Sequence, residues 1–145
     1  KERYNQLWQS FYQLKRDRSV VYKGEKNGEM IYEFTSKGQK KIRNFLLDAL
    51  EILPPRKWDG EWRVIIFDIP EKYRRARQAL QSKLADMGCF PLQKSVWVHP
   101  FPCEEEVEFL KELLNIKPFV HILRVKEMTE GKTLYHFKEL LEDVI

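Results

Sequence analysis

The sequence contains no long run of apolar residues. Its longest uninterrupted stretch of aliphatic or aromatic side chains runs from Val64 to Phe67, whereas a helix that crosses a bilayer needs about 20 such residues. The N-terminus is rich in charged and amide side chains and lacks the apolar segment of a secretion signal. These absences exclude a transmembrane protein, and we expect a cytoplasmic one.

Cysteine is scarce as well. Only Cys89 and Cys103 occur, and neither belongs to a CxxC motif or to a Cys/His cluster. A disulfide framework and a structural zinc site are therefore not expected. The pattern predicts two reduced, half-buried thiols instead.

What the sequence does have is enough apolar material for a core. The chain of 145 residues is 43% hydrophobic and 33% charged, a composition typical of one folded domain or two small ones. Its net charge of +4 is uneven, because residues 1–58 hold 13 basic and 7 acidic side chains whereas residues 59–145 hold 13 and 15. A basic first segment is typical of a phosphate-binding module, although it is as often only a solvated surface.

A break in the chain is predicted at residues 53–60, where two prolines and an Asp-Gly pair end any helix and favour a turn. In this interpretation residues 1–53 form the first domain, residues 58–128 form the second, and residues 129–145 add a C-terminal helix. Within the first domain, apolar residues at helical spacing predict a helix over 3–16. An Asn-Gly pair then joins two β-rich runs, 19–23 and 30–34, and Ser36 is the expected N-cap of a further helix.

The second segment alternates strands and helices. Residues 62–68 predict a buried strand, 70–88 a helix, 92–99 an extended stretch, 104–114 a helix and 119–125 a strand. Residues 133–144 complete the chain as an amphipathic helix with Leu134, Phe137, Leu141 and Val144 inward. The predicted fold is α+β, with a βαββαβ ferredoxin-like domain and an added C-terminal helix.

Helix, basic hairpin and helix is the order of the second half of a winged helix-turn-helix, in which one helix reads the major groove and the hairpin lies along the backbone. Asn and Gln suit base reading because they form bidentate pairs with adenine. The candidate base-contacting residues are Asn5, Gln6, Gln9, Ser10 and Gln13. The candidate phosphate-contacting residues are Lys15, Arg16, Arg18, Lys23 and Lys26. A plain amphipathic helix with a surface hairpin explains the same pattern equally well.

Two helices normally precede the recognition helix of such a module, and this sequence has no room for them before residue 3. The chain also begins at Lys1 without a methionine. We therefore expect a partial winged helix-turn-helix, taken from a longer protein.

Asp68 is the best chemical candidate of the second segment, because it ends a buried strand at the point where a helix begins. A lone carboxylate there is either a magnesium ligand or the N-cap of the helix. The cap is the favoured interpretation.

Three arginines, Arg74, Arg75 and Arg77, stand in the first turns of that helix, where positive charge opposes the helix dipole. They therefore need anionic partners. Phosphates are one possibility, and ion pairs with the run of glutamates at 104–106 are the preferred one. His99 and His121 stand alone and are expected to be packing or surface residues.

Two motifs carry a resemblance to a known family. The stretch from Val64 to Glu71, followed by Arg74 and Arg77, and the stretch from Leu92 to Val98, followed by Pro100, are similar to the central domain of PaaX-type transcriptional repressors. That domain resembles in turn the small CRISPR-associated Cas2-like nucleases. The resemblance implies a ferredoxin-like domain that forms a homodimer, attached to a winged helix-turn-helix that binds a palindromic double-stranded DNA operator.

The resemblance also bears on single residues. The matching aspartate of the Cas2-like nucleases faces its dimer mate and is associated with divalent metal binding, so Asp68 is the alternative catalytic and metal-binding residue, with Mg²⁺ as the alternative cofactor. Asp68 and Trp97 are the residues expected at the dimer interface, Trp97 because an open sheet would expose its apolar face. The chain ends soon after Glu142, without the longer C-terminal region of the larger repressors. We therefore expect no acyl-CoA effector site, and the sequence names no other effector.

The leading interpretation is a dimeric DNA-binding transcriptional regulator with no catalytic residue and no cofactor. The alternative is a Cas2-like metal-dependent nuclease, or a non-catalytic subunit of a nucleic-acid-processing complex. A plain dimerisation module with an incidental basic face is the third interpretation. The hairpin favours the regulator, because a stand-alone nuclease does not need one. Asp68 is the feature that favours the nuclease, because a regulator does not need it as a metal ligand.

Overall fold

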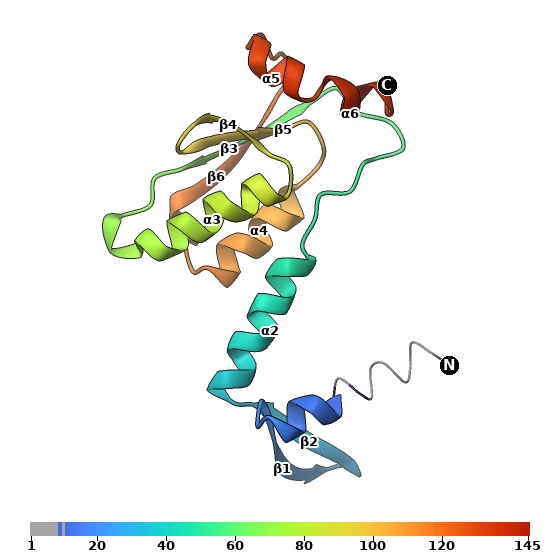
Figure 1. Cartoon of the computed structure of the whole chain (residues 1–145), viewed down its shortest axis with the longest axis vertical. Helices are drawn as coiled ribbons and strands as arrows, with labels where there is room; N and C mark the ends of the chain where they lie inside the picture. The colour runs from blue at the N-terminus through green and yellow to red at the C-terminus, as the bar shows by residue number, and fades with distance from the viewer. Residues whose placement is uncertain (1–8, 10) are drawn as a thin grey trace. The chain divides into compact units, whose positions relative to one another are not determined.

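The chain folds as two compact units, residues 1–49 and residues 50–145 (Figure 1). The computed structural model describes residue 9 and residues 11–145. In the part of the chain so described, no helix is long and apolar enough to cross a bilayer.

Unit 1 consists of a helical segment, a hairpin and a helix. Residues 11–16 are helical, and β1 (Val20–Lys26) pairs antiparallel with β2 (Glu29–Phe34). Asn27 and Gly28 form the turn, both with positive φ, of 54° and 80°. This is the backbone that an Asn-Gly pair adopts most readily, so the predicted turn is confirmed. The strands run closer to the turn than predicted, which leaves a two-residue loop.

The helix α2 (Ser36–Ala49) starts one residue earlier than a Ser36 cap would require. The backbone N–H of Gly38 donates to Thr35 Oγ1 at 3.1 Å, so Thr35 is the capping residue and the prediction of Ser36 was wrong by one position. Gly38 itself is required, since a Cβ atom there would lie 1.8 Å from the carbonyl oxygen of Ser19. Close packing of the helix on the start of β1 therefore sets where α2 begins.

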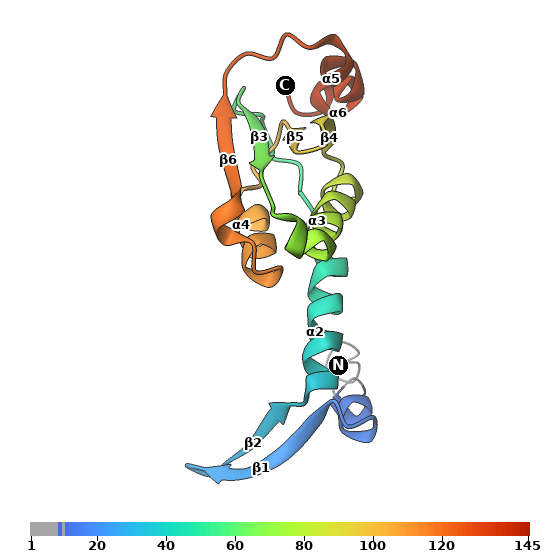
Figure 2. The ribbon, with the colours of Figure 1, turned by 90° about the vertical axis from the view of Figure 1, so that its left-hand side faces the viewer.

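Unit 2 is built on a four-stranded antiparallel sheet in the order β4-β5-β3-β6. Its strands are β3 (Trp62–Phe67), β4 (Phe90–Gln93), β5 (Val96–His99) and β6 (Val120–Val125). Its longer helices are α3 (Arg74–Asp86) and α4 (Glu104–Leu113), which cover one face of the sheet (Figures 1 and 2). Short 3-10 turns at Glu71–Tyr73 and Lys117–Phe119 precede α3 and β6. This βαββαβ order is that of the predicted ferredoxin-like fold.

Two elements differ from the prediction. The extended stretch 92–99 is a hairpin, β4 and β5, that turns at Lys94 and Ser95. The single C-terminal helix is two short ones, α5 (Gly131–His136) and α6 (Lys138–Glu142), because Phe137 leaves the helical conformation with φ −97° and ψ 5°.

The break at Phe137 has a packing cause. Its ring is buried and packs edge-on against Trp62 and His99, with ring centroids 5.8 and 5.3 Å away. The free energy gained by burying this ring exceeds the cost of interrupting the helix at Phe137. Leu134, predicted to point inward, is 41% exposed as a result, and Thr133 is buried in its place.

The core of unit 2 lies on both sides of β3. Ile65 and Phe67 are buried on the face that α3 and α4 cover, together with Leu80, Leu84, Val107 and Leu110. A second cluster joins the sheet to the C-terminal helices: Trp62, Val98, Phe101, Phe137, Leu141 and Val144. Ile52 and Trp58 pack against that cluster, and the Trp58 N–H donates to the Val144 carbonyl at 2.8 Å. The segment after residue 49 and the C-terminal helices therefore belong to the same unit as the sheet.

Both cysteines are buried and free, deeper than the half-buried thiols that were expected. Burial raises the pKa of Cys103 to about 12, and it also raises the pKa of Cys89. Both side chains are therefore neutral thiols at physiological pH.

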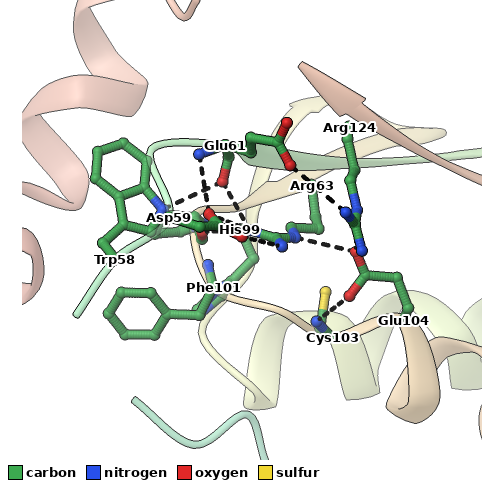
Figure 3. Close-up of polar contacts among 10 residues, drawn as sticks. Trp58, Asp59, Glu61, Arg63, His99, Phe101, Cys103, Glu104 and Arg124 are labelled. Carbon is green, nitrogen blue, oxygen red and sulfur yellow. Dashed lines mark hydrogen bonds and ion pairs between the residues drawn. The ribbon is translucent and has the colours of Figure 1, made fainter. Parts of the chain in front are cut away.

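A buried guanidinium holds the first residues of β3 in place (Figure 3). The Arg63 side chain is 1% exposed and forms a two-pronged ion pair with Asp59, at 2.9 Å from Nη1 and 2.6 Å from Nη2. Its Nε donates to Glu104 Oε1 at 3.1 Å, and Nη1 also donates to the carbonyls of Glu61 and Pro100. The hydrogen bonds from Arg63 lower the pKa of Asp59 to about 2. One side chain thus links the segment before β3, the loop after β5 and the first residue of α4.

Replacement of Arg63 by Met should lower the free energy of unfolding of unit 2 by about 3 kcal/mol, because the carboxylates of Asp59 and Glu104 lose a buried partner. Arg124→Met is the matched control, since Arg124 pairs with Glu104 and Glu61 from a side chain that is 60% exposed. The control should cost less than about 1 kcal/mol. Urea unfolding followed by tryptophan fluorescence measures both, and equal losses would show that the buried guanidinium has no special role.

Candidate functional site

The candidate base-contacting residues lie in unit 1. Gln9 and Gln13 are helical and exposed, as a groove-facing side chain must be. Asn5, Gln6 and Ser10 lie outside the described residues. Gln9 and Gln13 are therefore accessible, and their contact with bases stays a prediction.

The candidate phosphate-contacting cations divide into two groups. Lys15 Nζ lies 5.4 to 5.8 Å from the ring centres of Phe11, Tyr12 and Tyr32, within cation–π range. Lys23 pairs loosely with Glu33, at 3.8 Å between two exposed side chains. The second group consists of Arg16, Arg18 and Lys26, whose exposed side chains have no ionic partner within the part of the chain that the structure describes. This second group is the more available to phosphates.

Sequence reasoning missed a basic face on α2. Four cations on this helix are exposed: Lys37, Lys40, Lys41 and Arg43. Lys37 donates to the Asp17 carbonyl, and Lys41 forms an ion pair with the Asp17 carboxylate. Hydrogen bonds from Lys41 and Ser19 lower the pKa of Asp17 to about 2. The signal was present in the sequence, because four basic residues fall within positions 37–43. The prediction of this helix considered only its apolar positions.

Asp68 follows β3 and is exposed. Its backbone N–H donates to the Phe119 carbonyl at 2.9 Å, but the turn at 71–73 is preceded by Pro70 and α3 by Tyr73, neither with a side-chain cap. The interpretation of Asp68 as the N-cap was therefore wrong. Pro70 and the 3-10 turn separate the carboxylate from the first N–H groups of α3.

Two of the three arginines of α3 form ion pairs, but with a different partner than expected. Glu71 pairs with Arg77 at 3.0 Å and with Arg74 at 3.7 Å, whereas Arg75 has no ion pair among the described residues. Of the expected partner run at 104–106, Glu104 pairs with Arg63 and Arg124 instead. These two arginines thus pair with Glu71, which is three or six positions away along the chain, and not with the distant glutamates at 104–106.

The surroundings of Asp68 do not fit a divalent cation within one chain. The carboxylate lines a surface hollow of about 590 Å³ together with Arg77 and Lys94, whose charges oppose a metal ion. Among residues 9 and 11–145, no three His, Cys, Asp or Glu side chains gather as a metal-binding group would. Magnesium in proteins takes oxygen ligands in near-octahedral geometry, and Asp68 supplies only one carboxylate.

The two histidines behave as predicted. His99 is buried, its Nδ1 accepts the Phe101 N–H at 3.1 Å, and burial lowers its pKa to about 4, with the neighbouring His136 and Arg63 adding to the effect. His99 is therefore a neutral packing residue at pH 7. His121 is exposed on β6.

Trp97 was expected to be exposed, and this was wrong. The side chain is only 8% exposed, and its Nε1 donates to the Lys94 carbonyl at 3.1 Å. Trp97 pairs in register with Ile65, so it lies on the sheet face that α3 and α4 cover. A single chain buries it without a partner.

The opposite face of the sheet is covered in part by the cluster of Trp62, Val98 and the C-terminal helices, and the rest of it is left open. Val64 pairs in register with Leu123, and Ile66 with Val96. Three of these side chains are half-buried, and Leu123 is 47% exposed. An apolar patch thus lies at the middle of the sheet, away from α3 and α4.

Comparison with known proteins agrees with this architecture. Residues 55–135 match the model of the PaaX protein central Cas2-like domain. The match covers more than half of the chain, and the chain therefore belongs to the PaaX family. No curated protein sequence matches it.

Wild-type protein incubated with DNA or RNA in Mg²⁺ or Mn²⁺ should show no cleavage, because Asp68 shares its hollow with two cations. Asp68→Asn should unfold at the same urea concentration as the wild type, since the exposed carboxylate caps no helix. Gel assays of labelled duplexes and single strands provide the test. Metal-dependent cleavage that disappears in Asp68→Asn would contradict this and establish a nuclease.

Proposed function

We propose that the chain is a PaaX-like transcriptional repressor that binds a double-stranded DNA operator through unit 1 and dimerises through unit 2. The observation that carries the proposal is the sequence of elements in unit 1, an exposed helical segment, a hairpin and a basic helix. These elements precede, in one chain, a domain of a family of transcriptional regulators. The proposal treats unit 1 as the second half of a winged helix-turn-helix.

Within unit 1, each element has a part in this proposal. The helical segment that ends at residue 16 presents Gln9 and Gln13, whose amides can pair with adenine in the major groove. The hairpin acts as the wing and carries Lys26 next to its turn. Lys40 and Arg43 on α2 are exposed, with no ionic partner among the residues that the structure describes, and add further phosphate contacts.

Replacing Arg16 or Lys26 by Ala should weaken binding to every duplex about equally and reduce the slope of log K against log salt by about one unit. Lys132→Ala, an exposed lysine of unit 2, is the control and should leave the slope unchanged. Fluorescence anisotropy at several salt concentrations gives the slopes. An unchanged affinity in the quadruple Ala variant of Lys15, Arg16, Lys23 and Lys26 would contradict the phosphate contacts.

Replacement of Gln9 or Gln13 by Ala should act differently, by relaxing the preference for one sequence at about 1–3 kcal/mol per lost bidentate pair. A uniform loss across sequences would mean that these amides do not face the bases.

The dimer rests on the open face of the sheet. Leu123 is 47% exposed there, beside Val64 and Ile66, which are only half-buried. A second copy related by a two-fold axis would bury the same patch on both chains, which is how isologous dimers close. A two-fold dimer also matches a palindromic operator. The proposal therefore moves the interface from Trp97 to the face around Leu123.

Leu123→Asp should convert a dimer into the 17.6 kDa monomer, because two carboxylates would be buried in the apolar contact. Leu134→Asp is the control, since Leu134 is similarly exposed but lies on α5. Sedimentation velocity at micromolar concentration distinguishes the species. A wild-type monomer, or an unchanged dimer in Leu123→Asp, would contradict this interface.

A further inference from the structure

A surface hollow beside Asp68 combines charges of both signs from three parts of unit 2. Its walls are Phe67 to Ile69 at the end of β3, the face of α3 that carries Arg77, Gln78 and Gln81, and the β4–β5 turn at Lys94 and Ser95. The volume, about 590 Å³, is in the range of small-molecule sites. The regulator proposed above has no use for this hollow.

The frame of the hollow is fixed by hydrogen bonds. Arg77 is held at both ends of its guanidinium, by Glu71 at 3.0 Å and by the Ile69 carbonyl at 3.4 Å. The Lys94 carbonyl accepts from Gln81 Nε2 at 3.0 Å and from Trp97 Nε1 at 3.1 Å. These contacts fix the arginine and the turn before any ligand arrives, which lowers the entropic cost of binding.

Four other side chains that line the hollow are free to contact a ligand. In the part of the chain that the structure describes, no hydrogen bond or ion pair engages the side chains of Asp68, Gln78, Lys94 or Ser95. Lys94 and Ser95 supply donors, Asp68 supplies an acceptor, and Gln78 supplies both. Together with Arg77, whose charge is paired with Glu71, they give the hollow two cations and one carboxylate.

We propose that this hollow binds a small phosphate monoester that also carries hydroxyl groups, of the sugar phosphate class. The phosphate dianion would lie between Lys94 and Arg77, where charge-assisted hydrogen bonds are strongest. Asp68 would accept a hydrogen bond from a hydroxyl of the same molecule, and Gln78 and Ser95 would add further polar contacts.

The carboxylate selects this ligand against two others. Duplex DNA offers phosphodiesters but no free hydroxyl groups along its backbone, so Asp68 would only repel it. A divalent cation would meet one carboxylate and two positive charges. A molecule that combines an anion with hydroxyl donors uses Arg77 and all four of the unpaired polar side chains.

Ribose 5-phosphate is a suitable probe because it contains both parts, and ribose and inorganic phosphate contain one each. In ¹H–¹⁵N spectra of the whole chain, ribose 5-phosphate at millimolar concentration should shift the amide signals of Asp68, Gln78 and Ser95. Ribose should shift none of them, and inorganic phosphate should bind about tenfold more weakly.

Two variants test the assigned roles. Lys94→Gln should weaken ribose 5-phosphate binding about tenfold through loss of one charge-assisted hydrogen bond. Asp68→Asn should weaken ribose 5-phosphate but leave inorganic phosphate binding as tight or tighter. Lys132→Gln, which alters a lysine lining a different hollow, should change neither. Both test positions are exposed, so unchanged spectra elsewhere confirm that the variants fold.

Three results would overturn the proposal. The first is the absence of any shift with ribose 5-phosphate. The second is a shift of the same amides by Mg²⁺ alone that disappears in Asp68→Asn, which would make the hollow a metal site. The third is a shift by a short DNA duplex, lost in Lys94→Gln, without a shift by ribose 5-phosphate. None of these depends on whether unit 1 reads an operator.

Discussion

The ion pairs of Arg63 hold together the parts of unit 2 that the sheet alone does not connect. The guanidinium is buried at the start of β3 and reaches Asp59 before the strand, the Pro100 carbonyl after β5, and Glu104 at the start of α4 (Figure 3). Trp58 Nε1 donates to the same Pro100 carbonyl at 2.6 Å. The segment that enters unit 2 is therefore anchored where sheet and helix meet. Removing a buried charge from this many partners costs free energy, so the contacts of Arg63 fix the geometry of the chain around the start of β3.

Local signals predicted local structure well. The Asn27-Gly28 turn needs only two residues with positive φ, and Gly88, with φ 92°, follows the C-cap of α3, at the last residue of the predicted helix 70–88. The order of strands and helices in unit 2 followed from apolar periodicity, which depends on the neighbours of each residue along the chain. These features are short-range, so one sequence suffices to find them.

The two misplaced helix caps were local errors, but the errors that matter most for the fold and the site concern contacts between distant residues. The break at Phe137 depends on Trp62 and His99, and the burial of Trp97 depends on helices that cover one face of the sheet. Arg63 reads in the sequence as one charged residue in an apolar strand, and only the fold shows that Glu104 stands beside it. Likewise, Asp68 and Lys94 share a hollow because the β4–β5 turn folds back toward the end of β3. Spacing along the chain carries no information on such pairs.

The two units present different surfaces. Unit 1 carries exposed amides and exposed cations, whereas unit 2 carries a partly open apolar sheet face and a polar hollow. The function that we propose is that of a dimeric reader of duplex DNA. Selection of bound duplexes from a random pool by the complete protein tests this most directly. A dimeric reader should enrich an inverted repeat, with two half-sites separated by about one helical turn. A pool that remains random after repeated rounds at moderate salt would contradict it.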